Sequence, residues 1–565
     1  MSIQQQQPMP IVLLREGATE TKGNQAQRNN ITAAKTIAEI VRSSLGPRGM
    51  DKMLVNNIGD VTITNDGATI LKEMDVQHPA AKMMVEISKA TDNEVGDGTT
   101  STVVLAGSLL SKAEELIAKD VHPTVIVDGY RMASEKAIEM LRNAATKVDP
   151  TDRQILGKIA RTSMASKLVS VNSEPLSKIV VDAVIAVAEK AIDNNNLRVD
   201  PDNIKVEKKA GGSVEDTKLI EGIVLDKEVV HGAMPKRIEE AKIALLNAAL
   251  EIEKTEMSAE IRISDPQQMQ MFLEEENRML KSMADKITAS GANVLLCQKG
   301  IDDLAQHYLA KEGILSVRRV KESDMNNLAK ATEGRVLSNI DELSASDLGY
   351  AKLVEERKIE TDKWVFVEGC KNPKAVSILV RGGSQRVVDE AERSVHDAIM
   401  AVKDVVEYPY ITVGAGAPEV YISQKIREWS TSLSGRSQLA VERFADSVEE
   451  IAIALAENAG MDPLDTQAQL RAKAAVAKPK YGVDVLNGKV SDMAAKDIYE
   501  PLKVKEQVIN AATEASSMIL RIDDVISASK SKESGPPPGA GMGGMGGMGG
   551  MGGMGGMGGM GGMDM

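Results

Sequence analysis

Residues 94–101 read Glu-Val-Gly-Asp-Gly-Thr-Thr-Ser, a glycine-rich break directly before a helical pattern that runs from Thr100 to Lys119. Backbone N–H groups at a helix start are free to bind phosphate oxygens, and glycines let the backbone approach them closely. Asp97 adds a carboxylate of the kind that holds Mg²⁺. The stretch therefore predicts a phosphate site. An ordinary capped helix start is the alternative, because Asp, Gly and Thr all favour that position.

Three further glycine-containing segments interrupt predicted helices or strands. Residues 44–49 read Ser-Leu-Gly-Pro-Arg-Gly, residues 64–69 read Thr-Asn-Asp-Gly-Ala-Thr, and residues 414–418 read Gly-Ala-Gly-Ala-Pro. Taken singly, the first is also explained by an ordinary helix end and the other two by tight turns. Asp397 lies within a predicted helix, where a solvated carboxylate is the alternative to a functional one.

Composition excludes several classes of protein. The chain has 565 residues, 42% hydrophobic but only 2% aromatic, so we expect an aliphatic core divided among roughly three or four domains. A formal net charge of -14 argues against nucleic acid as a main partner. No apolar run reaches the roughly 20 residues of a membrane span, and from the polar, Gln-rich start we expect no signal peptide. These features predict a cytoplasmic protein without a membrane partner, in which Cys297 and Cys370 are reduced and buried.

Familiar catalytic motifs are missing from the sequence. There is no G-x-x-x-x-G-K-[ST] loop, no zinc-ligand spacing among the 5 histidines and no G-x-S-x-G segment. An ordinary P-loop enzyme, a zinc enzyme and an α/β-hydrolase are therefore all disfavoured.

Hydrophobic periodicity predicts an alternation of helices and short strands. Helices are expected at 31–45 with Asn30 as N-cap, 80–91, 100–119, 236–290 with an interruption at 263–266, 384–406, 417–433 and 439–460. Strands are expected at 10–16 and 61–64 and within 203–232 and 293–337. Residues 541–563 repeat Gly-Gly-Met, which predicts a flexible tail.

Together, the segments at 44–54, 64–69 and 94–100 resemble the signature set of the chaperonins, and of archaeal group II chaperonins in particular. Further similar segments lie at 230–235, 244–246, 296–303, 317–320, 381–383 and 396–398. The resemblance covers essentially residues 10–530. It implies a multidomain protein with a mostly α-helical equatorial ATPase domain, a small α/β intermediate domain, and an α/β apical domain with a helical protrusion. The implied ranges are 1–150 with 411–535, 151–218 with 373–410, and 219–372 with the protrusion at about 245–290, followed by a disordered tail at 536–565.

The same resemblance implies an ATP-dependent chaperone. It would enclose unfolded or partly folded proteins in a double ring of its own copies or of paralogous subunits. The protrusion would serve as a built-in lid, so no separate lid co-chaperonin is expected. A small-molecule kinase is a weaker alternative, because the predicted apical segment offers no clustered catalytic constellation. A non-folding ATP-binding scaffold or filament is the other alternative, which the loss of Asp66, Asp97 or Asp397 would have favoured, and all three are present.

The resemblance also implies residue roles. Asp66 and Asp397 would activate the attacking water, and Asp97 would ligate Mg²⁺. ATP would contact Ser44, Leu45, Gly46, Pro47, Asp97, Gly98, Thr99, Thr100, Ser101, Lys167, Gly414, Ala415, Gly416, Asp484, Glu500 and Lys505. Exposed apolar residues of the protrusion would contact substrate proteins or other lids, although packing within the protrusion explains them too: Met269, Met271, Phe272 and Leu273. Two positions depart from the family pattern, since Ala415 stands where Gly is frequent and Thr91 where Gln is usual.

Overall fold

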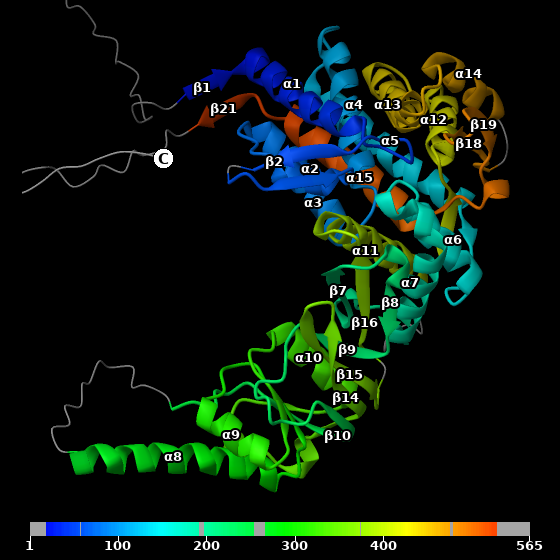
Figure 1. Cartoon of the computed structure of the whole chain (residues 1–565). Helices are drawn as coiled ribbons and strands as arrows, with labels where there is room; N and C mark the ends of the chain where they lie inside the picture. Colours follow the sequence, from blue (N-terminus) through cyan, green and yellow to red (C-terminus); the bar gives the residue numbers. More distant parts are fainter. Residues whose placement is uncertain are drawn as a thin grey trace, which may run out of the picture. The chain divides into compact units, whose positions relative to one another are not determined.

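The computed structural model describes residues 19–56, 58–190, 197–252, 266–372, 374–474 and 478–527, which belong to two compact units (Figure 1). In the first unit, β1 (Thr19–Lys22) pairs antiparallel with β21 (Asp524–Ser527). The second unit, Gly23–Asp523, holds all the other described elements. The strand expected at 10–16 and the tail expected at 536–565 lie outside the described residues.

A helical core brings together buried aliphatic side chains from the two ends of the second unit. Its helices are α1 (Gly23–Arg42), α2 (Gly67–Glu73), α3 (Pro79–Val95), α4 (Thr99–Ile117), α5 (Pro123–Ala144), α12 (Ala417–Ser430), α13 (Arg436–Asn458), α14 (Pro463–Lys473) and α15 (Leu502–Leu520). Small residues let these helices approach closely: a Cβ at Gly107 would lie 2.2 Å from the Cβ of Ala38. The aliphatic core expected from the composition is confirmed here.

Short strands attach to the helical core as hairpins and a small sheet. The hairpins are β2 (Lys52–Val55) with β3 (Val61–Thr64) and β18 (Tyr481–Asp484) with β19 (Lys489–Asp492). In the small sheet, β17 (Tyr410–Val413) lies between β20 (Tyr499–Pro501) and β4 (Thr146–Lys147), and the 3₁₀ turn η6 (Ala494–Lys496) precedes β20.

A middle core is formed by helices packed on a three-stranded sheet. The sheet has the order β7 (Ile204–Ala210), β16 (Val376–Gly382), β8 (Lys218–Ile220), with β7 parallel and β8 antiparallel to β16. The helices are α6 (Arg153–Met164), α7 (Ser173–Val187) and α11 (Gln385–Glu407), and η1 (Leu168–Asn172) links α6 to α7. The remaining short elements of this region are β5 (Glu189–Lys190), β6 (Leu197–Arg198), η2 (Pro201–Asn203) and η3 (Val214–Asp216).

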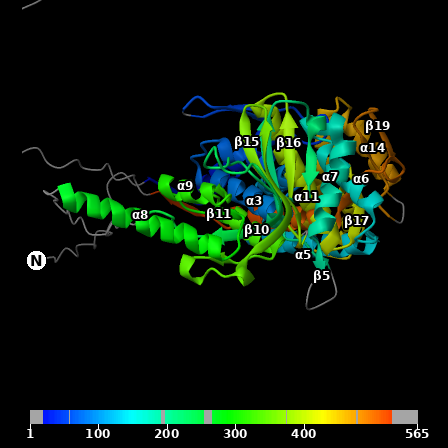
Figure 2. The same cartoon turned by 60° about the horizontal axis from the view of Figure 1, so that its bottom comes forward.

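A sheet core surrounds a seven-stranded mixed sheet. Its strands are β9 (Gly222–Leu225), β10 (Arg237–Leu246), β11 (Val294–Cys297), β12 (Leu315–Val317), β13 (Val336–Leu337), β14 (Gly349–Ile359) and β15 (Asp362–Cys370). The accompanying helical elements are α8 (Pro266–Ala289), α9 (Asp303–Lys311), α10 (Glu322–Thr332), η4 (Ile340–Glu342) and η5 (Ala345–Asp347). Figures 1 and 2 show α8 extending beyond the sheet, and only its C-terminal half, with Leu280, Ala284 and Ile287, joins this core.

Two predicted boundaries are wrong. The first helix begins at Gly23 rather than after Asn30, which is 1% exposed inside α1. Ala26, Asn30 and Ile31 form one buried face, so the helix continues through a segment that looks polar in the sequence. Asp66, expected in a turn, caps α2 instead, because its side chain accepts a hydrogen bond from the N–H of Thr69.

The helical prediction for 236–290 is wrong in its first part. Residues 237–246 form β10, which pairs with β11 on one side and with β14, followed by β13, on the other. Residues 243–246 are all buried, so they show no alternation of polar and apolar side chains that would have indicated a strand. The second part is confirmed from Pro266 to Ala289, and 253–265 lie outside the described residues. Among the helices in the described ranges, none has the length and apolarity that crossing a membrane requires.

Candidate functional site

The glycine-rich break at 96–98 joins α3 to α4 through left-handed backbone positions. Gly96 ends α3 with φ 64, and Gly98 precedes α4 with φ 75. A Cβ at Gly96 would lie 2.3 Å from the Cβ of Met400, so glycine is needed where the break meets α11. The predicted helix start is confirmed, and the break before it packs against α11, the helix that carries Asp397.

A cavity of about 740 Å³ opens beside this break, a size suited to a small organic ligand. The predicted site residues on its wall are Leu45, Gly46, Pro47, Asp97, Gly98, Ser101, Ala415, Gly416, Asp484, Glu500 and Lys505. They come from both ends of the second unit, so the fold brings together segments that are far apart in the chain. The other predicted residues are not among its lining residues: Ser44, Asp66, Thr99, Thr100, Lys167, Asp397 and Gly414.

Three of those other residues form a charged cluster. The Nζ of Lys167 lies 2.9 Å from the Oδ2 of Asp397 and 3.8 Å from the Oδ1 of Asp66. Lys167 and Asp397 are each 8% exposed. The hydroxyl of Thr99, next to Gly98 of the cavity wall, donates to Asp66 over 3.4 Å. The cluster therefore adjoins the cavity at the start of α4.

The pKa values in this region reflect an excess of buried carboxylates. Burial raises the pKa of Asp97 to about 6, and the charge of Asp397 adds to that shift. Burial, with the charge of Asp66, likewise raises the pKa of Asp92 to about 6. Burial also acts to raise the pKa of Asp66, but the charge of Lys167 and the hydrogen bonds from Thr69 outweigh it and leave that pKa lowered. Additional positive charge would be stabilised here.

Asp97 offers a cation a single carboxylate on this part of the wall. Within the described ranges, no three Asp, Glu, His or Cys side chains converge to form a metal-binding group. A cation at Asp97 would therefore complete its shell with water and with oxygens of a bound ligand. Mg²⁺ binds in this way, through one or two carboxylates together with phosphate oxygens and water. The donor set fits Mg²⁺ bound with a nucleotide.

Ala415, which has φ 59, lies on another part of the cavity wall. Its N–H donates to the Oε1 of Glu500 over 3.2 Å, and its carbonyl accepts from the N–H of Val483 over 2.9 Å. Lys505 is buried, lies 2.8 Å from the Oε1 of Glu419 and also pairs with Glu500. The departure from glycine thus falls at a position that does adopt the left-handed conformation, and hydrogen bonds hold it there on both sides.

Asp484 is engaged by its own hairpin. Its carboxylate accepts hydrogen bonds from the side chains of Asn487 and Ser491 and lies 2.9 Å from the Nζ of Lys496. At 5% exposed, it shapes the cavity wall more than it offers a free oxygen.

Sequence reasoning missed several residues that build the site. Asn458, at the end of α13, donates to the carbonyl oxygens of Arg42 (3.0 Å) and Leu45 (2.9 Å) and so fixes the turn that holds Gly46 and Pro47. Hydroxyl side chains around Lys167 also line the cavity: Thr162, Ser163, Ser166, Ser170 and Ser173. The concentration of Ser and Thr on both sides of Lys167 was the one local signal for them.

Two remaining predictions concern residues away from the cavity wall. Thr91, which stands where Gln is usual, is buried in α3. Its hydroxyl donates to the carbonyl of Ile87, so the polar group has a hydrogen-bond partner within its own helix. The apolar residues predicted on the protrusion lie in α8 and are exposed: Met269 53%, Met271 69%, Phe272 48% and Leu273 51%.

Comparison with known proteins gives a consistent picture. The model of the TCP-1/cpn60 chaperonin family matches residues 37–530. The chain is 57% identical over 531 residues to the thermosome subunit alpha of Archaeoglobus fulgidus, covering 94% of this chain and 97% of that one. It is 56% identical over 518 residues to the thermosome subunit of Methanopyrus kandleri, covering 92% and 95%. It is also 56% identical over 521 residues to that of Pyrococcus horikoshii, covering 92% and 94%.

Proposed function

Because this chain belongs to the TCP-1/cpn60 chaperonin family, we propose that the cavity beside Asp97 is its ATP site. The chain is a group II chaperonin, an ATPase that assists protein folding. The observation that best supports the site is its geometry: Asp97 lies on the cavity wall, and the cluster of Asp66, Lys167 and Asp397 adjoins it.

Each wall of the cavity has a separate task in this proposal. The free N–H groups at the start of α4, with Thr99, Thr100 and Ser101, bind phosphate oxygens. Bound Mg²⁺ would be held by Asp97 and would neutralise phosphate charge. The ribose and base lie toward the Ala415 turn and the β18–β19 hairpin, which contribute Asp484 and neighbouring apolar side chains.

Asp66 and Asp397 orient the attacking water and accept its proton. Lys167 is paired with Asp397 over 2.9 Å. A γ-phosphate would compete for that ammonium group, because phosphate oxygens are strong acceptors for a charged donor. Asp397 would then be released to accept the water proton. The γ-phosphate itself would thus free Asp397 to act as the general base.

We also propose the three-domain division given by the family resemblance. An equatorial domain (1–150 and 411–535), an intermediate domain (151–218 and 373–410) and an apical domain (219–372) are supported by the separate helical, middle and sheet cores. Each core draws its buried residues largely from one of these domains. The protrusion at about 245–290 is supported by the exposed N-terminal half of α8.

The assembled chaperonin is proposed to be a cytoplasmic double ring that encloses unfolded proteins beneath its built-in lid. Archaeoglobus fulgidus has both a thermosome subunit alpha and a subunit beta, which supports copies or paralogues as ring partners. The test combines ATP-dependent refolding of a denatured protein with negative-stain imaging of the purified chain. Rings that refold the protein only with ATP are expected. A monomer that hydrolyses ATP, or an inert ring, would contradict the proposal.

A further inference from the structure

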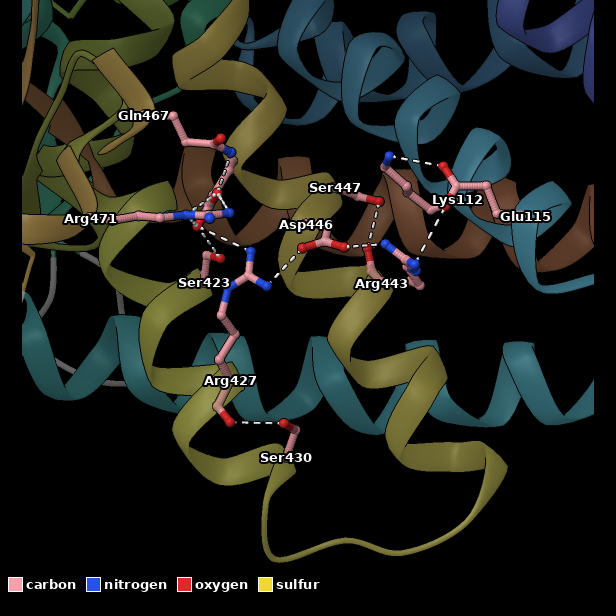
Figure 3. Close-up of polar contacts among 11 residues, drawn as sticks. Lys112, Glu115, Ser423, Arg427, Ser430, Arg443, Asp446, Ser447, Gln467 and Arg471 are labelled. Carbon is pink, nitrogen blue, oxygen red and sulfur yellow. Dashed lines mark hydrogen bonds and ion pairs between the residues drawn. The ribbon is translucent and has the colours of Figure 1, made fainter. Parts of the chain in front are cut away.

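The carboxylate of Glu449, in α13, is fully buried at 0% exposed and is held by neighbouring helices. From α14, the guanidinium of Arg471 donates to its Oε2 over 2.5 and 3.0 Å, and the side-chain amide of Gln467 over 2.8 Å. From α12, the hydroxyl of Ser423 donates to Oε1 over 2.7 Å, and Arg427 lies 3.3 Å away. Figure 3 shows these four side chains converging, and their contacts with Glu449 tie α12 and α14 to α13.

The ion pairs continue outward from this carboxylate to the surface. Arg427 also pairs with Asp446, which pairs with Arg443, which in turn lies 3.6 Å from Glu115 (Figure 3). These outer side chains are 22% to 42% exposed. Surface ion pairs contribute little to the stability of the folded state, whereas loss of one partner of a buried pair is strongly destabilising because it leaves an uncompensated buried charge. The buried end at Glu449 is the part that fixes geometry, and the outer end supplies a matched control.

α14 connects this carboxylate to the β18–β19 hairpin. Leu470 and Ala474 share the helical core with Val483 and Val490 of the hairpin. The Nζ of Lys473 donates to the carbonyl of Val490 over 3.3 Å. The hairpin therefore follows the position of α14.

The hairpin in turn forms part of the cavity wall. Val483, Asp484, Val485 and Leu486 line it. The N–H of Val483 donates to the carbonyl of Ala415, so the same strand supports the turn that holds the left-handed residue. In contrast, the break at 96–98 packs on α11 and α15, through Met400, Val504 and Val508.

We infer that Glu449 and Arg471 are positioning residues for ATP binding, which hold the hairpin wall at the base and ribose end of the cavity. This inference rests on the proposed ATP site. The inference has a specific consequence for binding. Loosening the hairpin should weaken the binding of ligands that contact the hairpin wall, and it should leave unchanged the binding of ligands that occupy only the phosphate side. A merely structural role would weaken both kinds of ligand together.

Glu449→Gln removes the charge and keeps the side-chain size, and Arg471→Lys keeps the charge but loses the two-point contact. For Glu449→Gln we expect the KM for Mg-ATP to rise about tenfold, which is about 1.4 kcal/mol, with kcat unchanged within about twofold. Arg471→Lys is expected to show a smaller rise in the same direction. Inhibition by Mg-tripolyphosphate, which has neither base nor ribose, should keep its inhibition constant in both variants.

Arg443→Gln is the matched control, since it breaks ion pairs of the same helix without touching α14, and it should leave both ligands unaffected. If the Glu449→Gln variant does not assemble, the KM for Mg-ATP and the tripolyphosphate inhibition constant of Arg471→Lys alone test the inference. An unchanged KM, or a parallel loss of ATP and tripolyphosphate binding, overturns the inference. Asp97→Ala tests the site itself: if it weakens neither ligand, the proposed ATP site fails, irrespective of Glu449.

Discussion

Ala415 holds a backbone conformation that glycine adopts more easily. At φ 59 an L-residue pays roughly 1–2 kcal/mol relative to the right-handed region. Glycine would relieve that strain, although it also gains more freedom in the unfolded chain. We therefore expect Ala415→Gly to raise the free energy of unfolding by about 0.5–1 kcal/mol. Denaturant unfolding measures it, with the exposed Ala118, which has φ -62, changed to glycine as the control. A lower free energy of unfolding in Ala415→Gly would contradict the claim that the backbone at Ala415 is strained.

Residues of the site differ in how far the sequence could predict them. Asp97 was predictable because its neighbours in the chain are also its neighbours in space. Asp397 is an ordinary helical carboxylate by itself and gained meaning only from a family resemblance. Asn458 was missed, because the carbonyls it binds, at Arg42 and Leu45, lie at the other end of the chain and leave no pattern beside it.

Helices were predictable from the sequence where one face of the helix is buried and the opposite face is exposed to water. α11 and α13 have clear apolar and polar faces, and their predicted positions agree with the structure within a few residues. β10 was predicted as a helix because its partners β11, β13 and β14 bury the end of the strand, so tertiary pairing overrides the local preference of an Ala- and Leu-rich segment.

The contact between α11 and α15 makes stability depend on pH. Asp404 of α11 is 0% exposed and lies 3.0 Å from the Nζ of Lys503. Burial raises its pKa from 3.8 to about 7 against the opposing effect of Lys503. Between those two values the folded state holds a proton that the unfolded state has lost. The stability from this group is therefore complete below pH 3.8 and is lost as the pH rises to about 7.

Asp404→Asn should flatten that pH dependence, because the amide does not titrate. Each unit of pKa shift corresponds to about 1.4 kcal/mol, so unfolding midpoints measured from pH 4.5 to 7.5 should resolve the difference from the parent chain. The control is Asp446→Asn, because Asp446 is a partly exposed carboxylate on α13. Identical pH slopes for Asp404→Asn and the parent would show that Asp404 does not titrate in this range.

At the scale of the whole molecule, we propose that exposed apolar side chains of α8 bind unfolded proteins or contact other lids. Met269 and Phe272 are 53% and 48% exposed, and flexible apolar side chains suit varied partners. Changing both to Ser should reduce binding of a denatured protein several-fold while ATP hydrolysis stays within about twofold of the parent. Light scattering of aggregating protein measures capture, and Glu276→Gln on the same helix is the control. Unchanged capture would assign these residues to lid contacts instead.

α11 links the proposed chemistry to the rest of the molecule. Its Asp397 belongs to the charged cluster and its Ala401 lines the cavity, while Val388, Ala391 and Val395 pack in the middle core. A change in the pairing of Asp397 when ATP binds or is hydrolysed would therefore act on a helix shared with the neighbouring core. We expect this helix to transmit the state of the nucleotide.

The most direct test of this account is the pair of ATP affinity and single-turnover hydrolysis rate in Asp397→Ala. The variant should bind Mg-ATP with near-parental affinity, because Asp397 does not line the cavity. Its hydrolysis rate should fall about 10²-fold or more, as expected when a general base is removed. Near-normal hydrolysis would contradict the assignment of Asp397 and, with it, the proposed role of the charged cluster.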